Sequence, residues 1–141
     1  MRMTLLRILR SFASILLGYI VIVVCTTAGF KPLGGIVHLH APLSIQAAGV
    51  LVAIFSGLLG GVTASFVAGR YPVRHAAGVL VFLFIDTAVV LSHGSTDPIW
   101  FALSGSATLM LATVAGGFVY HLVTRRRRSG YQSSRDGAES N

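Results

Sequence analysis

The chain has 141 residues, of which 54% are hydrophobic and only 11% are charged, and its net charge is +7. A soluble domain carries about 25% charged residues, so this composition excludes an ordinary soluble domain and is typical of a membrane protein. The single cysteine, Cys25, excludes an internal disulfide and a paired-cysteine redox or zinc motif. The basic residues flank apolar runs, so nucleic acid is not an expected partner.

The first predicted membrane span covers residues 9–30, where a basic start leads into an uncharged apolar run. A run of about 20 residues has the length of a full crossing, which exceeds the apolar core of a signal peptide. The nearest approach to a cleavage site, Thr26-Thr27-Ala28, matches the small-residue pattern poorly. We therefore expect this segment to be a transmembrane helix that ends at Lys31-Pro32.

Further apolar runs predict spans over residues 45–69, 75–93 and 98–124. The prolines all fall in the connections between these spans or at a span's first turn, where a missing backbone N–H is tolerated. Asp97 is expected to be the N-cap of the last span. The predicted fold is an all-α integral membrane four-helix bundle with up-down-up-down topology, and residues 1–124 form its transmembrane domain.

Residues 125–141 are basic and polar and have no apolar face, which predicts a disordered cytoplasmic tail. The tail begins with a run of arginines that is expected to contact anionic lipid head groups, each contributing about 1 kcal/mol. This run consists of Arg125, Arg126, Arg127 and Arg128.

The distribution of basic residues predicts the orientation of the chain. All of them except Lys31 lie in the N-terminal flank, in the turn at residues 70–75 or in the C-terminal tail. Positive charge stays on the cytoplasmic side, so we expect an inner-membrane protein with both termini in the cytoplasm. Loops 31–44 and 94–98 are then expected to face outward.

Small residues recur every four positions in two of the predicted spans. This spacing makes a smooth stripe that favours close contact between helices, within one chain or between copies. We therefore expect the second and fourth spans to pack closely. The stripe residues are Gly49, Ala53, Gly57, Gly61, Ser65 and Gly69 in the second span and Ser104, Thr108, Ala112 and Gly116 in the fourth.

Asp86 is the only acidic residue inside a predicted span. An unpaired carboxylate at membrane depth costs roughly 2.5–3.5 kcal/mol, so its side chain is expected to face protein or water. It either serves as a proton or cation site or pins its helix to hydroxyl groups on a neighbour. His93 lies about 10 Å away and within about 20° of the same helix face, which makes it a candidate second member of the site.

The outer loops contain histidines that suit zinc or copper, since neutral imidazole binds both metals. His38 and His40 alternate along one segment, and His93 lies in the other loop. Their spacing matches no established metal signature, so they are weak metal candidates and no cofactor is predicted.

The chain contains no nucleotide-binding loop, catalytic triad or metalloprotease motif, so an enzyme is not expected. The first hypothesis is a small membrane protein that acts by helix packing, as a homodimer or as an accessory subunit of a larger membrane complex. The alternative is a small proton- or cation-coupled transporter or channel that uses Asp86.

Overall fold

The computed structural model describes residues 2–35, 37–69, 71–93 and 97–139, and within these ranges it describes side chains from residue 8 to residue 125 except at Pro72. The described residues form four α-helices and one short 3-10 turn, without any strand. These elements are α1 (Arg2–Phe30), η1 (Lys31–Leu33), α2 (Leu43–Ala68), α3 (Pro72–Ser92) and α4 (Ile99–Glu139). The all-α prediction is confirmed.

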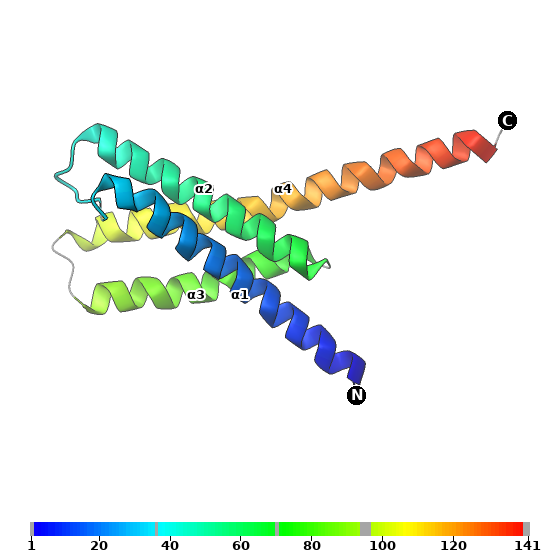
Figure 1. The fold of residues 1–141 in the computed structure, drawn as a ribbon, viewed down its shortest axis with the longest axis horizontal. Coiled ribbons are helices and arrows are strands. Elements are labelled where there is room, and N and C mark those ends of the chain that lie inside the picture. Colours follow the sequence, from blue (N-terminus) through cyan, green and yellow to red (C-terminus); the bar gives the residue numbers. More distant parts are fainter. Residues whose placement is uncertain (1, 36, 70, 94–96, 140–141) are drawn as a thin grey trace.

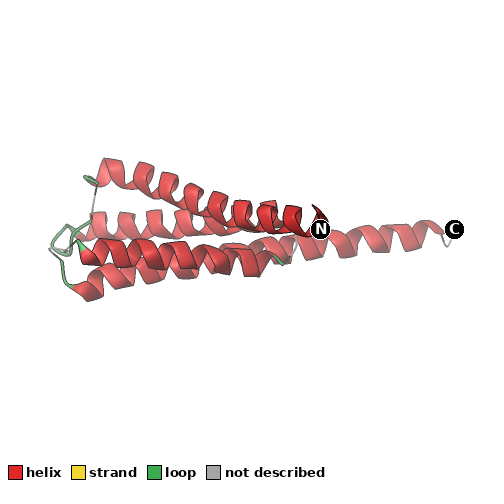
Figure 2. Ribbon diagram, turned by 90° about the horizontal axis from the view of Figure 1, so that it is seen from below, coloured by secondary structure: helices red, strands yellow, loops and turns green. Residues whose placement is uncertain are grey.

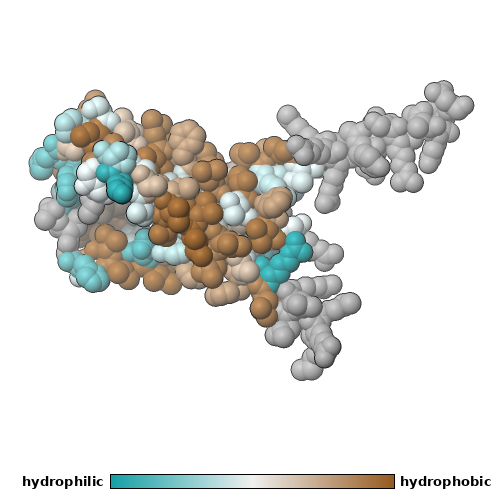
Figure 3. Space-filling model, in the orientation of Figure 1, coloured by the Kyte–Doolittle hydropathy of each residue, from teal (hydrophilic) through white to brown (hydrophobic). Residues whose placement is uncertain are grey.

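Each α-helix contains a segment that is long and apolar enough to cross a membrane. The shortest of these segments has 20 residues, which at about 1.5 Å per residue matches a hydrocarbon core of about 30 Å. Apolar side chains cover the middle of the face seen in Figure 3, and hydrophilic ones lie toward its two ends. The chain is therefore a small multi-pass membrane protein. The spans are Ile8–Leu33, Leu43–Ala68, Val73–Ser92 and Ile99–Arg125.

Successive helices run in opposite directions, as the up-down-up-down prediction requires (Figures 1 and 2). The connections from α1 to α2 and from α3 to α4 lie at one end of the bundle, which we call the loop end. Both chain termini and the turn from α2 to α3 lie at the other end, which we call the terminal end.

Helix α2 is the central element of the bundle. It packs most extensively against α4 and α1 and also contacts α3, while α3 contacts both α1 and α4. A buried cluster lies where α1, α2 and α3 meet, and it comprises Ile22, Ala64, Val79 and Leu83.

Glycine allows α2 and α4 to approach closely. A Cβ atom on Gly57 would lie 2.7 Å from both the Cβ of Ala112 and the carbonyl oxygen of Leu109. A Cβ on Gly61 would collide with the carbonyl of Thr113, and one on Gly116 with the carbonyl of Leu58. The two helix backbones are thus in contact where both helices carry small residues, which is the geometry that small-residue stripes permit.

A second close crossing, between α1 and α2, was not predicted from the sequence. A Cβ on Gly18 would lie 2.8 Å from the Cβ of Ala64, and one on Gly60 would lie 2.8 Å from the carbonyl oxygen of Gly18. Gly60 lies off the stripe that we identified, so α2 presents small residues to two neighbours at once.

Helix α4 continues to Glu139, whereas the sequence predicts a disordered tail from residue 125. Its apolar segment ends at Arg125, close to the expected end of the span at residue 124.

Candidate functional site

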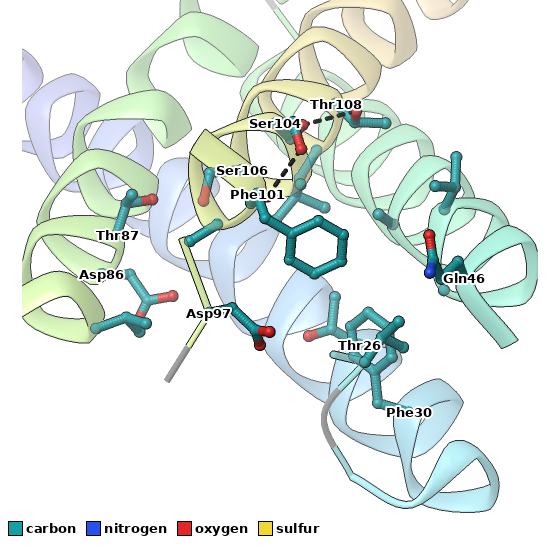
Figure 4. A pocket seen from close by; sticks show the side chains of 18 of the residues that line it. Thr26, Phe30, Gln46, Asp86, Thr87, Asp97, Phe101, Ser104, Ser106 and Thr108 are labelled. Atoms are coloured by element: carbon teal, nitrogen blue, oxygen red, sulfur yellow. Dashed lines mark hydrogen bonds between the residues drawn. The ribbon is translucent and has the colours of Figure 1, made fainter. Parts of the chain in front are cut away.

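A pocket of about 420 Å³ lies between the four helices near the loop end (Figure 4). Every α-helix contributes to its wall, together with Gly35 and Val37 of the first loop. Its polar side chains are Thr26 from α1, Gln46 from α2, Asp86 and Thr87 from α3, and Asp97, Ser104, Ser106 and Thr108 from the last connection and α4. None of the described lining residues is Lys, Arg or His.

The pocket extends from the loop end toward the middle of the membrane-spanning helices. Its deepest lining residues are Ala53 and Leu109, which lie about 15 Å along α2 and α4 from the first residues of those helices. This depth is about half of a hydrocarbon core of 30 Å. The close contact between Gly57 and Ala112 begins one turn further on and closes the bottom of the pocket.

Asp86 lines this pocket from α3. It lies about 9 Å from the end of α3 at Ser92, and its carboxylate points toward the interior of the pocket in Figure 4. The side chain is exposed, and within the described part of the chain it has neither a hydrogen-bond donor nor an ion-pair partner. The structure thus places the one intramembrane carboxylate on a hollow surface, where a ligand or water can reach it.

Asp97 joins the two loops at the loop end. Its Oδ2 atom lies 2.9 Å from Nδ1 of His38, and its Oδ1 atom accepts a hydrogen bond of 3.1 Å from the backbone N–H of Leu39. These contacts, the Leu39 N–H first, hold the pKa of the Asp97 carboxyl below its usual range. Asp97, which the sequence predicts as the N-cap of α4, thus bridges to the first loop.

Gln46 holds the same loop from α2. Its Nε2 atom donates to the carbonyl oxygens of Leu39 and Ala41, at 2.7 and 2.9 Å. The backbone of Leu39 is thus bonded on both sides, with its N–H to Asp97 and its C=O to Gln46. This arrangement ties residues 39–41, which follow the lining residue Val37, to α2 and to Asp97.

The three outer histidines do not converge on one point. His38 pairs with Asp97, His40 is exposed, and Nδ1 of His93, which follows α3, lies 2.8 Å from the carbonyl oxygen of Val89 in the last turn of that helix. No group of three or more His, Cys, Asp or Glu side chains that could hold a metal occurs among the described residues. His93 does not line the pocket, so the structure does not bring it into one site with Asp86.

The stripe residues of α2 meet several different neighbours. Gly49 packs against Val37 and Phe30, and the stripe residues as far as Ser65 are buried. Gly69 instead ends the helix with a φ of 67°, next to the Arg10 side chain. A spacing of four residues turns about 40° further than one helical turn, so a stripe of this length winds around the helix.

The stripe residues of α4 are divided between the pocket and the helix contact. Ser104 and Thr108 line the pocket, whereas Ala112 and Gly116 are buried against α2. Ser104 is exposed, and Thr108 is partly buried.

Only the first arginine of the predicted lipid contact falls among the described side chains. Arg125 is exposed and ends the apolar segment of α4. The side chains of Arg126, Arg127 and Arg128 lie outside the described ones.

Sequence reasoning missed the aromatic part of the pocket. Phe30 ends α1 and Phe101 lies in the first turn of α4, and both rings line the pocket although 71 positions separate them. No local signal marks either residue, because phenylalanine is ordinary in a membrane span. No protein-family model, curated protein or solved structure matches this chain, so the geometry of the pocket carries the functional argument.

Proposed function

We propose that this membrane protein moves a proton or a small cation, and that the pocket at the loop end is its working site. The observation that supports the proposal is the unpaired carboxylate of Asp86 on a pocket that reaches the middle of the bundle. Ionisable groups at membrane depth are expensive to maintain, and they mark ion and proton pathways in many membrane proteins.

Charge favours a cation over an anion at this site. Asp86 and Asp97 both line the pocket, and the described lining residues include no basic side chain. A hollow with low-dielectric walls and charge of one sign concentrates counter-ions. The site is therefore expected to attract protons and cations and to repel anions.

The contact between α2 and α4 would act as the barrier of such a transporter. The pocket ends one turn before Gly57 and Ala112, and beyond them the helices are packed backbone to backbone. Transport through a site that opens toward one side requires a rearrangement that opens the other side. Contacts made by glycine and alanine leave few side chains to rearrange in such a movement.

The packing hypothesis receives less support from the geometry. Gly57, Gly61 and Gly116 are buried between two helices of one chain, so these residues are not available to bind a second chain. A homo-oligomer or an accessory subunit would have to use another surface. We therefore favour the non-enzymatic transporter over the packing partner.

The proposed location is the inner membrane, with both termini cytoplasmic and the pocket opening outward. Its basis is the concentration of basic residues at the terminal end. In a Cys25→Ser background, an impermeant maleimide added to intact cells should label Ser44→Cys and leave Ser133→Cys unlabelled. The reverse labelling pattern would overturn this orientation.

The decisive experiment is a flux assay in proteoliposomes. The purified protein should carry protons or monovalent cations down an imposed gradient, and Asp86→Asn should reduce the rate to that of protein-free liposomes. Asp136→Asn is the matched control, because it removes the same charge from the tail and should leave flux unchanged. Wild-type flux in Asp86→Asn, or no flux in any sample, would contradict the proposal.

A further inference from the structure

We propose that the pocket at the loop end binds an organic ammonium ion, with its charge at Asp86 and its apolar substituents against the rings of Phe30 and Phe101. This inference names a ligand class for the site and rests on the proposed function. It depends on the size of the pocket, its lining and the state of its two carboxylates.

The pocket is larger than a bare inorganic ion requires. The pocket measures about 420 Å³, within the range of roughly 300–1,000 Å³ that is typical of small-molecule sites. Transition metals prefer His and Cys ligands, and no group of three or more His, Cys, Asp or Glu side chains that could hold a metal occurs among the described residues. A molecule of several non-hydrogen atoms fits this volume better.

The lining matches a cation that carries apolar groups. Phe30 and Phe101 provide aromatic faces, and Val50, Val90 and Leu91 provide aliphatic surface. Apolar substituents of an organic ammonium ion can pack on these rings, and an aromatic substituent gains ring–ring contact in addition to apolar burial. A hydrated inorganic cation has no apolar group that could pack against this surface.

The two carboxylates of the pocket differ in their hydrogen-bond partners. Asp97 is engaged by the Leu39 N–H and by His38, so much of its hydrogen-bonding capacity is already used within the protein. Asp86 has no such partner in the described part of the chain, and its exposed carboxylate points into the pocket (Figure 4). Asp86 is therefore the group that is available to pair with a ligand cation.

The chain carries an internal reporter for this site. Trp100 is its only tryptophan, and its ring meets that of Phe101 edge to face with centroids 5.9 Å apart. A ligand that packs on Phe101 is expected to change the surroundings of Trp100. Binding is therefore measurable by Trp100 fluorescence and, independently, by isothermal titration calorimetry.

The test uses the full-length protein in nanodiscs of zwitterionic phosphatidylcholine, titrated with phenyltrimethylammonium at constant ionic strength. Wild type should bind saturably, Asp86→Asn should weaken the affinity by about tenfold or more, and Asp136→Asn should bind like wild type. Equal affinity in wild type and Asp86→Asn, or an equal response to potassium ions alone, would overturn the inference.

A second variant keeps the test decisive if Asp86→Asn does not fold. Phe101→Leu should weaken phenyltrimethylammonium binding by about fivefold, because the contact between the two rings is lost, while binding of tetramethylammonium, which has no ring, should change much less. Equal losses for both ions, or none for either, would contradict ligand contact with the ring.

The binding and flux experiments separate the two proposals. Saturable binding that depends on Asp86, without flux of any cation, would support the ligand site and refute transport. Flux of protons or potassium that depends on Asp86, without binding of phenyltrimethylammonium, would support transport and refute the organic-cation site.

Discussion

The two halves of the α2–α4 pair carry similar small residues but have opposite effects on the bundle. Toward the terminal end, a Cβ on Gly61 would collide with the Thr113 carbonyl, and Gly116 is buried. Toward the loop end, a Cβ on Gly105 would meet nothing within 4 Å, and Ser104 is exposed on the pocket. We call the part of the α2–α4 pair around Gly61 and Gly116, where small residues bring the helices into contact, the closed half. We call the part around Ser104 and Gly105, where small residues line the pocket, the open half.

The small-residue stripe winds around its helix, and this explains why the same spacing produces a close contact in one half and lines the pocket in the other. Residues four apart advance about 40° around the helix at each step, so two such stripes face each other over only a few turns. Beyond that zone the small residues face other helices, a loop or open space. Small residues at every fourth position therefore predict a close helix contact without specifying where along the helix it occurs.

The largest expected effect on stability comes from placing a large side chain at the helix contact in the closed half. Gly61→Leu would place a side chain against the Thr113 backbone, which cannot yield as a flexible side chain would. We expect a loss of about 3 kcal/mol or more in the free energy of unfolding, measured by denaturant titration in bicelles.

Gly105→Leu is the matched change in the open half. The added side chain would enter open space on the pocket wall, so the free energy of unfolding should stay within about 0.5 kcal/mol of wild type. Equal destabilisation by Gly61→Leu and Gly105→Leu would break the distinction between the two halves.

A smaller effect is expected at the rim of the pocket. Gln46→Met keeps the shape of the side chain but removes the two hydrogen bonds to the Leu39 and Ala41 carbonyls. At about 1 kcal/mol each, their loss should lower stability by about 1–2 kcal/mol in the same titration. Ser44→Ala, at an exposed residue of the same turn, should have no measurable effect. A Gln46→Met protein as stable as wild type would show that these bonds do not hold the loop.

The smallest effect is confined to the loop end and depends on pH. Because the Asp97 pKa is lowered in the folded protein, its bonds to Leu39 and His38 should persist at neutral pH and above the pKa of the unfolded chain. They should be lost as the pH falls through the lowered pKa. The amide proton of Leu39, followed by nuclear magnetic resonance in micelles, should move upfield over that acidic range.

The terminal end supplies the control for this titration. The amide of Ala64 in the closed half has no titrating partner of this kind and should keep its shift over the same range. Asp97→Asn should abolish the acid-dependent change at Leu39. A Leu39 shift that changes equally in wild type and Asp97→Asn would refute the role of the carboxylate.

The candidate site was only partly predictable from the sequence. Asp86 was identifiable because a carboxylate within an apolar run is chemically costly. The pairing of Asp86 with His93 was an interpretation from helix periodicity, and the structure places only Asp86 on the pocket. Phe30, Phe101 and Gln46 carried no local signal, because their role depends on elements that are distant in the sequence.

The sequence by itself determined the number, approximate limits and alternating direction of the membrane helices. The physical reason is that a bilayer requires about 20 apolar residues per crossing and leaves no alternative to internally bonded backbone. Only the tertiary structure decided which small residues close the bundle and which line the pocket beside Asp86. That choice depends on where helix axes cross, which is set by the packing of all four helices together and by no single segment.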